Sequence, residues 1–189
     1  MELADLHRRS VESWQSRLDA VSPAQWSART PCAEWDVRAL VNHVVGEELW
    51  TVPLVDGATI EEVGDRFDGD LLGDDPTAVG RSAAAEAVAA VDRQLPEGRI
   101  VHLSFGDVPI EEYVHQLSAD HLVHSWDLAV ATGQESSLDD DLVREVSRWF
   151  AEREEMYRAG GAVGPALPGN GDPQSELLGA FGRAARAAT

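Results

Sequence analysis

The spacing of hydrophobic residues along the chain predicts a protein built mostly from helices. Apolar residues three or four apart define a first helix over about residues 3–20 and a second over about 37–50. Asp36 is placed to accept hydrogen bonds from the exposed amides that open the second helix. Pro53 has no backbone amide hydrogen, so the second helix is expected to end before it.

Later parts of the chain alternate helical spacing with turn-forming residues. The expected segments are a long connection over 52–76 with one helical turn at 60–63, a helix over 77–95, a small hairpin around Phe105-Gly106-Asp107, a helix over 110–132 closed by Gly133, a helix starting after Ser137, a loop over 160–174 and a short helix from Ser175. These elements predict an all-α four-helix up-and-down bundle with an extra helix and a short hairpin. No internal repeat or linker divides the chain, so residues 1–189 are expected to form a single domain.

The net charge of the chain indicates which classes of partner it can bind. All fifteen basic residues are arginine, and the formal net charge is −19. Nucleic acids and anionic membranes are therefore not expected as partners, because binding to phosphates requires clustered cations. A small-molecule substrate remains as the expected partner, and a second copy of the chain could form a homodimer.

Cysteine usage and hydrophobic runs indicate the compartment. The one cysteine, Cys32, excludes an internal disulfide and a zinc site built from cysteines. No run approaches the roughly 20 apolar residues of a membrane span. The charged N-terminal stretch MELADLHRRS lacks the apolar core of a secretory signal. We therefore expect a cytoplasmic protein.

Asp120 and His124 form the clearest candidate site, within the stretch SADHLVHSWDLAVATG at 118–133. They are four residues apart, so on a helix they share one face, where a carboxylate and an imidazole can bind the same transition metal. His43, in the middle of the second helix among apolar residues, is the best candidate for a third ligand. Three protein ligands leave a coordination position open, which suits a catalytic site. Asp127 could orient the ring of His124 by accepting a hydrogen bond.

A simpler interpretation is that these histidines are capped or paired residues of a helical core. His121 is expected to point away from the face that Asp120 and His124 share. Cys32 has no sequence neighbour that would lower the pKa of its thiol, which favours packing over a nucleophilic role. Trp35 and Trp126 could line a pocket, although tryptophans at helical spacing usually belong to the core.

Two stretches also resemble a known family. TPCAEWDVRALVNHVVGEELW, residues 30–50, and SADHLVHSWDLAVATG are similar to the DinB-like metal-binding superfamily. The nearest branch contains the N-terminal domain of mycothiol-dependent maleylpyruvate isomerase, and the tail GPALPGNGDPQSELLGAFGR is similar to the ending of that family. The resemblance implies a DinB-like four-helix bundle that binds one divalent metal, zinc or alternatively nickel, through His43, Asp120 and His124. It also implies mycothiol as a thiol cosubstrate.

Two differences from the isomerase bear on the reaction. The isomerase looks to use glutamate where this chain has Asp120, and the shorter arm of aspartate could shift the metal or its geometry. The isomerase also continues into a second domain beyond the point where this chain ends, so its specific reaction is not carried over.

The leading hypothesis is a metal-dependent enzyme that activates a low-molecular-weight thiol for S-transfer or isomerisation, as a transferase or isomerase. Metal-assisted hydrolysis of an amide or ester is less favoured, because the sequence shows no general base beyond the ligands. The alternative is a non-catalytic protein of the same fold that binds a metal or small ligand. A third interpretation is a helical protein without a metal.

Overall fold

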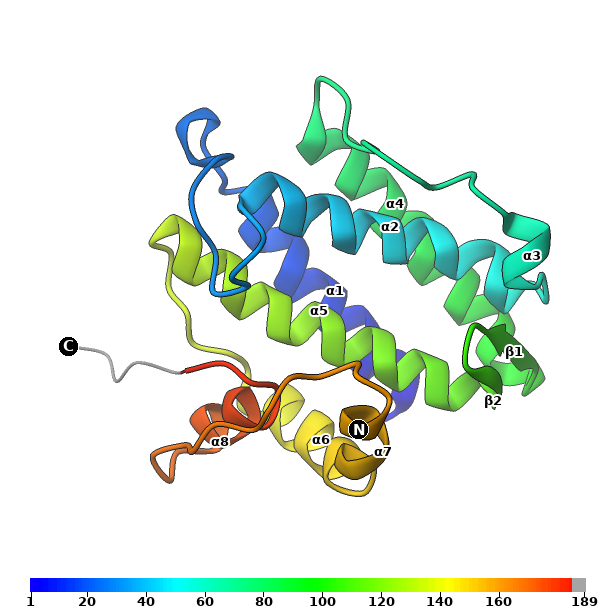
Figure 1. The fold of residues 1–189 in the computed structure, drawn as a ribbon. Coiled ribbons are helices and arrows are strands. Elements are labelled where there is room, and N and C mark those ends of the chain that lie inside the picture. Colours follow the sequence, from blue (N-terminus) through cyan, green and yellow to red (C-terminus); the bar gives the residue numbers. More distant parts are fainter. Residues whose placement is uncertain (185–189) are drawn as a thin grey trace.

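The computed structural model describes residues 1–184, and most of them are helical (Figure 1). Its helices are α1 (Leu3–Leu18), α2 (Val37–Val55), α3 (Ile60–Val63), α4 (Pro76–Gln94), α5 (Ile110–Thr132), α6 (Asp140–Ala151), α7 (Glu154–Ala159) and α8 (Pro173–Ala180). Short 3-10 turns lie at Pro23–Gln25 and Leu95–Glu97, and β1 (Ile100–Leu103) pairs with β2 (Gly106–Pro109) as an antiparallel hairpin. The predicted all-α fold with a small hairpin is confirmed. Within the described range, no helix is long and apolar enough to span a bilayer.

Four long helices, α1, α2, α4 and α5, form the bundle. α1 packs against α4 and α5, and α2 packs against the same two helices. The C-terminal ends of α1 and α5 coincide, since the side chain of Gln134 donates to the carbonyl of Arg17 over 3.0 Å. The C-terminal ends of α2 and α4 also coincide, since the guanidinium of Arg93 lies 2.8 Å from the carboxylate of Asp56. Each of these two pairs of helices is therefore parallel.

The connection between α2 and α4 accounts for the parallel pairs. Residues 56–75 leave the end of α2, form α3 and return along the length of the bundle before α4 begins (Figure 1). The helix directions along the chain are thus up, down, down and up. The predicted four-helix bundle is confirmed, and one long crossover replaces the strict alternation of an up-and-down arrangement.

The second helix continues through Pro53, where the sequence predicted that it would already have ended. α2 extends to Val55, and both Leu54 and Val55 are buried. They pack with hydrophobic residues of β1 and α5. Burial of two aliphatic side chains outweighs the backbone hydrogen bond that proline cannot make.

Most other boundaries lie within two or three residues of those predicted. Gly133 closes α5 with a φ of 69°, in the left-handed region that glycine adopts at no steric cost. Asp139 caps α6 by accepting from two backbone amides of its first turn. The structure also contains α7, which the sequence did not predict. Its short segment EEMYRA is mostly polar, carries no buried residue and has no hydrophobic spacing that would indicate a helix.

α5 is the central helix of the molecule. The bundle helices α1 and α2 cover it on one side, and α6 joins it through a hydrophobic cluster that also includes α8 (Figure 1). Sixteen of its 23 residues are buried. Polar side chains on α5 are therefore held inside the protein, where they need partners from neighbouring helices.

Candidate metal centre

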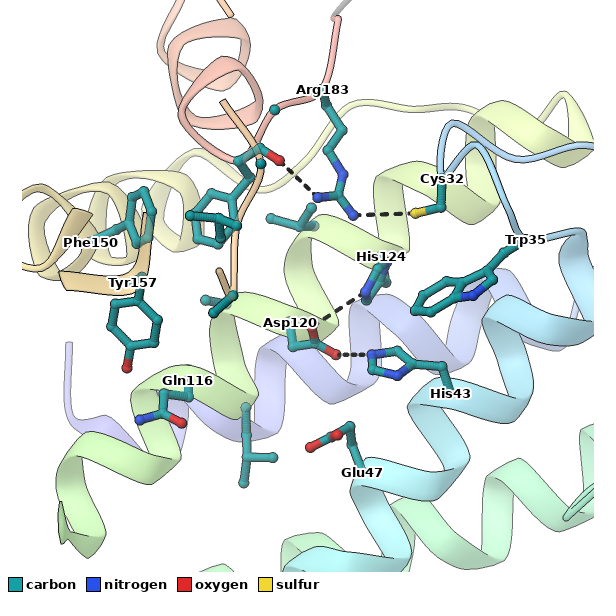
Figure 2. Close-up of a pocket in the computed structure, with 18 of the residues that line it drawn as sticks. Cys32, Trp35, His43, Glu47, Gln116, Asp120, His124, Phe150, Tyr157 and Arg183 are labelled. Atoms are coloured by element: carbon teal, nitrogen blue, oxygen red, sulfur yellow. Dashed lines mark hydrogen bonds and ion pairs between the residues drawn. The ribbon is translucent and has the colours of Figure 1, made fainter. Parts of the chain in front are cut away.

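His43, Asp120 and His124 meet between α2 and α5 (Figure 2). The Nε2 atom of His43 lies 3.4 Å from one carboxylate oxygen of Asp120, and the Nε2 atom of His124 lies 3.3 Å from the other. One donor atom from each residue falls within 4.8 Å of the other two. The structure thus brings together the three residues that the sequence singled out, and their role as metal ligands stays a prediction.

The chemistry of these donor atoms fits a divalent metal. Two imidazole nitrogens and a carboxylate oxygen are a usual donor set for zinc and for related transition metals. The Oδ2 atom of Asp120 is buried and accepts no hydrogen bond from the described residues, and the Nε2 atom of His43 faces it at 3.4 Å. A buried carboxylate oxygen without a hydrogen bond is costly unless a cation faces it.

Asp127 fixes the orientation of the His124 ring. The Nδ1 atom of His124 lies 2.8 Å from the fully buried carboxylate of Asp127. If Nδ1 donates this hydrogen bond, the lone pair of Nε2 faces Asp120, which is the tautomer that metal binding requires. The orienting contact that the spacing of these two residues suggested is therefore present.

Arg183 and Cys32 complete the surroundings of Asp127. Arg183 follows α8 and donates to the carboxylate of Asp127 over 2.8 Å, while its guanidinium also contacts the sulfur of Cys32 at 3.3 Å (Figure 2). The Cys32 thiol lies 3.3 Å from the same carboxylate. Cys32 is partly buried and has polar partners. The sequence had favoured simple packing for this residue. Cys32, His124 and Asp127 could also be grouped around a cation, but the guanidinium of Arg183 already neutralises Asp127.

The charges of the site stabilise each other. Burial alone would raise the pKa of Asp120, but His124 and His43 outweigh it and hold that pKa well below its usual value. Burial alone would lower the pKa of His124, but the carboxylates of Asp120 and Asp127 outweigh it and raise that pKa well above its usual value. The cluster therefore favours a carboxylate facing a positive charge. A divalent cation and a proton compete for such a position.

Glu47 is a candidate functional residue that the sequence interpretation missed. It lies one turn after His43 on α2 and lines the same cavity (Figure 2). Burial, followed by the nearby charge of Asp120, raises the pKa of the Glu47 carboxyl. A carboxyl at this position can exchange a proton with a molecule bound in the cavity. The four-residue spacing from His43 was the signal that could have identified it.

A large cavity opens beside the three candidate ligands. Its volume is about 1150 Å³, and α2, α5, α6, α7 and the segments around 162–167 and 181–183 contribute to its walls. The indole of Trp35 packs against the ring of His43, with 4.7 Å between their centroids. Trp35 thus lines the cavity, whereas Trp126 belongs to the core. The cavity gives a small molecule access to the donor atoms.

His121 points to the other side of α5, as predicted. Its Nε2 atom lies 3.1 Å from the carboxylate of Glu48, and both side chains are buried. His7 of α1 lies next to this pair. His115 and His102 lie outside the lining of the cavity. None of these four histidines belongs to the candidate metal site.

The chain belongs to the family of the mycothiol maleylpyruvate isomerase N-terminal domain, whose model matches residues 7–129. The matched range includes His43, Asp120 and His124. An uncharacterized protein of Mycobacterium tuberculosis, found in two strains, is 33% identical over 172 residues, which are 88% of this chain and 82% of that protein. No solved structure matches the chain. The resemblance noted from the two sequence stretches is confirmed.

Proposed function

We propose that this protein is a divalent-metal-dependent enzyme that activates a low-molecular-weight thiol of the mycothiol type for S-transfer or isomerisation. The observation that carries the proposal is the convergence of three donor atoms, from His43, Asp120 and His124, at the wall of a large cavity. The mycothiol in the name of the family supports the choice of a thiol.

Zinc is the proposed metal, with nickel as the alternative, because both accept imidazole and carboxylate ligands. Three ligands from the chain leave room for one from the cavity. A bound divalent cation would supply Lewis acidity, which lowers the pKa of a thiol and so favours the nucleophilic thiolate at neutral pH.

Side chains around the ligands would assist in distinct ways. Asp127 would hold the imidazole of His124 in the required orientation through its hydrogen bond of 2.8 Å. Trp35, packed on the ring of His43, would limit the access of water to that ligand. Glu47, which lines the cavity one turn from His43, would accept the proton of an incoming thiol or return it to a product.

The proposal is tested by loading the protein with cobalt and titrating it with a thiol. Cobalt(II) replaces zinc in such sites and absorbs visible light, and a thiolate that joins its ligands adds a charge-transfer band in the near ultraviolet. We expect both signals with N-acetylcysteine or mycothiol in the wild type. His43→Gln should lose them, and His102→Gln, a change on the hairpin, should keep them.

The outcomes separate the enzyme from the alternative of a non-catalytic binding protein. Cobalt bands without a thiolate band would refute thiol activation and leave a metal-binding protein. A thiolate band without consumption of the thiol, in the presence of a panel of carbon electrophiles, would leave a thiol-binding protein without turnover. Absence of cobalt bands would refute the metal site itself.

A further inference from the structure

Aromatic side chains are concentrated on the walls of the cavity. The chain has six tryptophans, two tyrosines and four phenylalanines. Three of the tryptophans, both tyrosines and three of the phenylalanines line the cavity. A site in which most of the aromatic residues of a protein converge favours a flat apolar ligand, which stacks on or packs edge-to-face against them.

The same walls offer little to a negatively charged ligand. Apart from the two candidate metal-binding histidines, Arg183 is the only basic residue in the lining among residues 1–184. Its guanidinium already pairs with the buried carboxylate of Asp127 at 2.8 Å. Glu34 and Glu47 add acidic groups to the lining. A ligand with two carboxylates could place one on a metal, and the second would then lie near acidic side chains with no free cation among the described lining residues, which is costly.

The side chain of Gln116 places a polar group in the wall of the cavity, away from the candidate ligands. Gln116 lies on α5 one turn before Asp120, and its side chain lines the cavity (Figure 2). Its amide nitrogen is buried and has no hydrogen-bond partner among the described residues. A carbonyl group on a ligand would satisfy that donor, because a buried donor without an acceptor loses free energy.

Two hydrophobic side chains at the rim of the cavity are exposed. Phe105, at the tip of the hairpin between β1 and β2, is 66% exposed, and Leu167, in the loop before α8, is 39% exposed. Both residues line the cavity. Exposed hydrophobic side chains at the mouth of an aromatic pocket are typical of a site that buries an apolar ligand.

We propose that the cavity binds an uncharged aromatic molecule with a carbonyl-type acceptor, and that it disfavours organic dicarboxylates. Under the proposed function, on which this part rests, such a molecule is the acceptor substrate of the thiol reaction. The binding itself depends on the walls of the cavity and not on the metal. It can therefore be measured whether or not the proposed function holds.

The test uses the uncharged fluorescent probe N-phenyl-1-naphthylamine, whose emission rises in apolar sites, on the purified protein with zinc and after treatment with EDTA. Competitors of matched shape are 2-naphthamide, which is uncharged, and naphthalene-2,6-dicarboxylate, which carries two charges. We expect the probe to bind in both forms and the amide to displace it. The affinity for the dicarboxylate should be lower than the affinity for the amide by at least about tenfold, both with zinc and after EDTA treatment.

Two variants locate the binding. Phe105→Ser should weaken the affinity for the probe by about three- to tenfold, because one aromatic contact at the rim is removed. Val130→Ser, an equally simple change at an exposed position of α5 that does not line the cavity, should leave binding unchanged. Both side chains are exposed, so neither change should affect folding.

Three results would overturn the proposal: no rise in probe emission with either form, displacement by the dicarboxylate as strong as by the amide, or equal effects of the two variants. Failure of the proposed function would look different. The cobalt or thiolate signals would then be absent while the EDTA-treated protein still bound the probe and the amide.

Discussion

His7 is a buried histidine that should make the stability of the protein sensitive to acid. Its side chain is 1% exposed, and neither ring nitrogen has a hydrogen-bond partner among the described residues. Burial, followed by the charges of His121 and Arg8, lowers the pKa of His7 from 6.5 to about 3. In the folded protein His7 is therefore neutral across the physiological range.

The size of the effect follows from the two pKa values. In the unfolded chain the pKa of His7 is about 6.5, so below that pH the unfolded state binds a proton that the folded state excludes. Stability is thus fully present above pH 6.5 and is lost as the pH falls toward about 3. Between pH 7.5 and pH 5.0, His7 should reduce the free energy of unfolding by about 2 kcal/mol.

His7→Leu isolates this contribution. Leucine has a similar volume and no titrating group, so the variant should be at least as stable as the wild type at pH 7.5. Urea unfolding, followed by tryptophan fluorescence with EDTA present, would give the free energy at pH 7.5 and 5.0. We expect the loss on acidification to shrink by about 2 kcal/mol in His7→Leu and to stay unchanged in His102→Gln. Equal losses in wild type and His7→Leu would refute the burial argument.

Three further changes test other parts of the structure. Asp127→Asn should weaken metal binding by about ten- to a hundredfold, measured by competition with a chromogenic chelator, because the hydrogen bond that orients a ligand loses its charge; unchanged affinity would contradict that role. Gly179→Ala should lower the melting temperature, since a Cβ there would collide with the backbone carbonyl of Leu167, whereas Gly164→Ala has open space and should not. Asp36→Ala should cost about 1 kcal/mol in urea unfolding by removing the cap of α2, and Asp36→Asn, which can still cap, should cost far less.

The elements with strong local signals were predictable from the sequence. α5 was located to the residue, because its hydrophobic spacing is continuous and a glycine in the left-handed region ends it. The meeting of His43 with Asp120 and His124 also followed from local patterns. Each residue lies on a helix face that has to turn toward a neighbouring helix.

Features that depend on contacts between distant segments were not predictable in the same way. The helix continued past Pro53 because the residues after it are buried by the hairpin and α5, which the local sequence does not reveal. The contact of Arg183 with Asp127 joins residues 56 positions apart. The parallel pairs of helices depend on the path of residues 56–75, which carry few hydrophobic residues to indicate a direction.

The metal content of the protein tests the central claim most directly. Tag-free wild type, Asp120→Asn, His124→Gln and the control His115→Gln would be analysed by inductively coupled plasma mass spectrometry. The account predicts about one equivalent of zinc or nickel in the wild type and the control, and its loss in the other two variants. It would be contradicted by wild-type protein that holds no metal even after zinc, nickel, manganese or iron is added, or by full metal content in both variants of the candidate ligands.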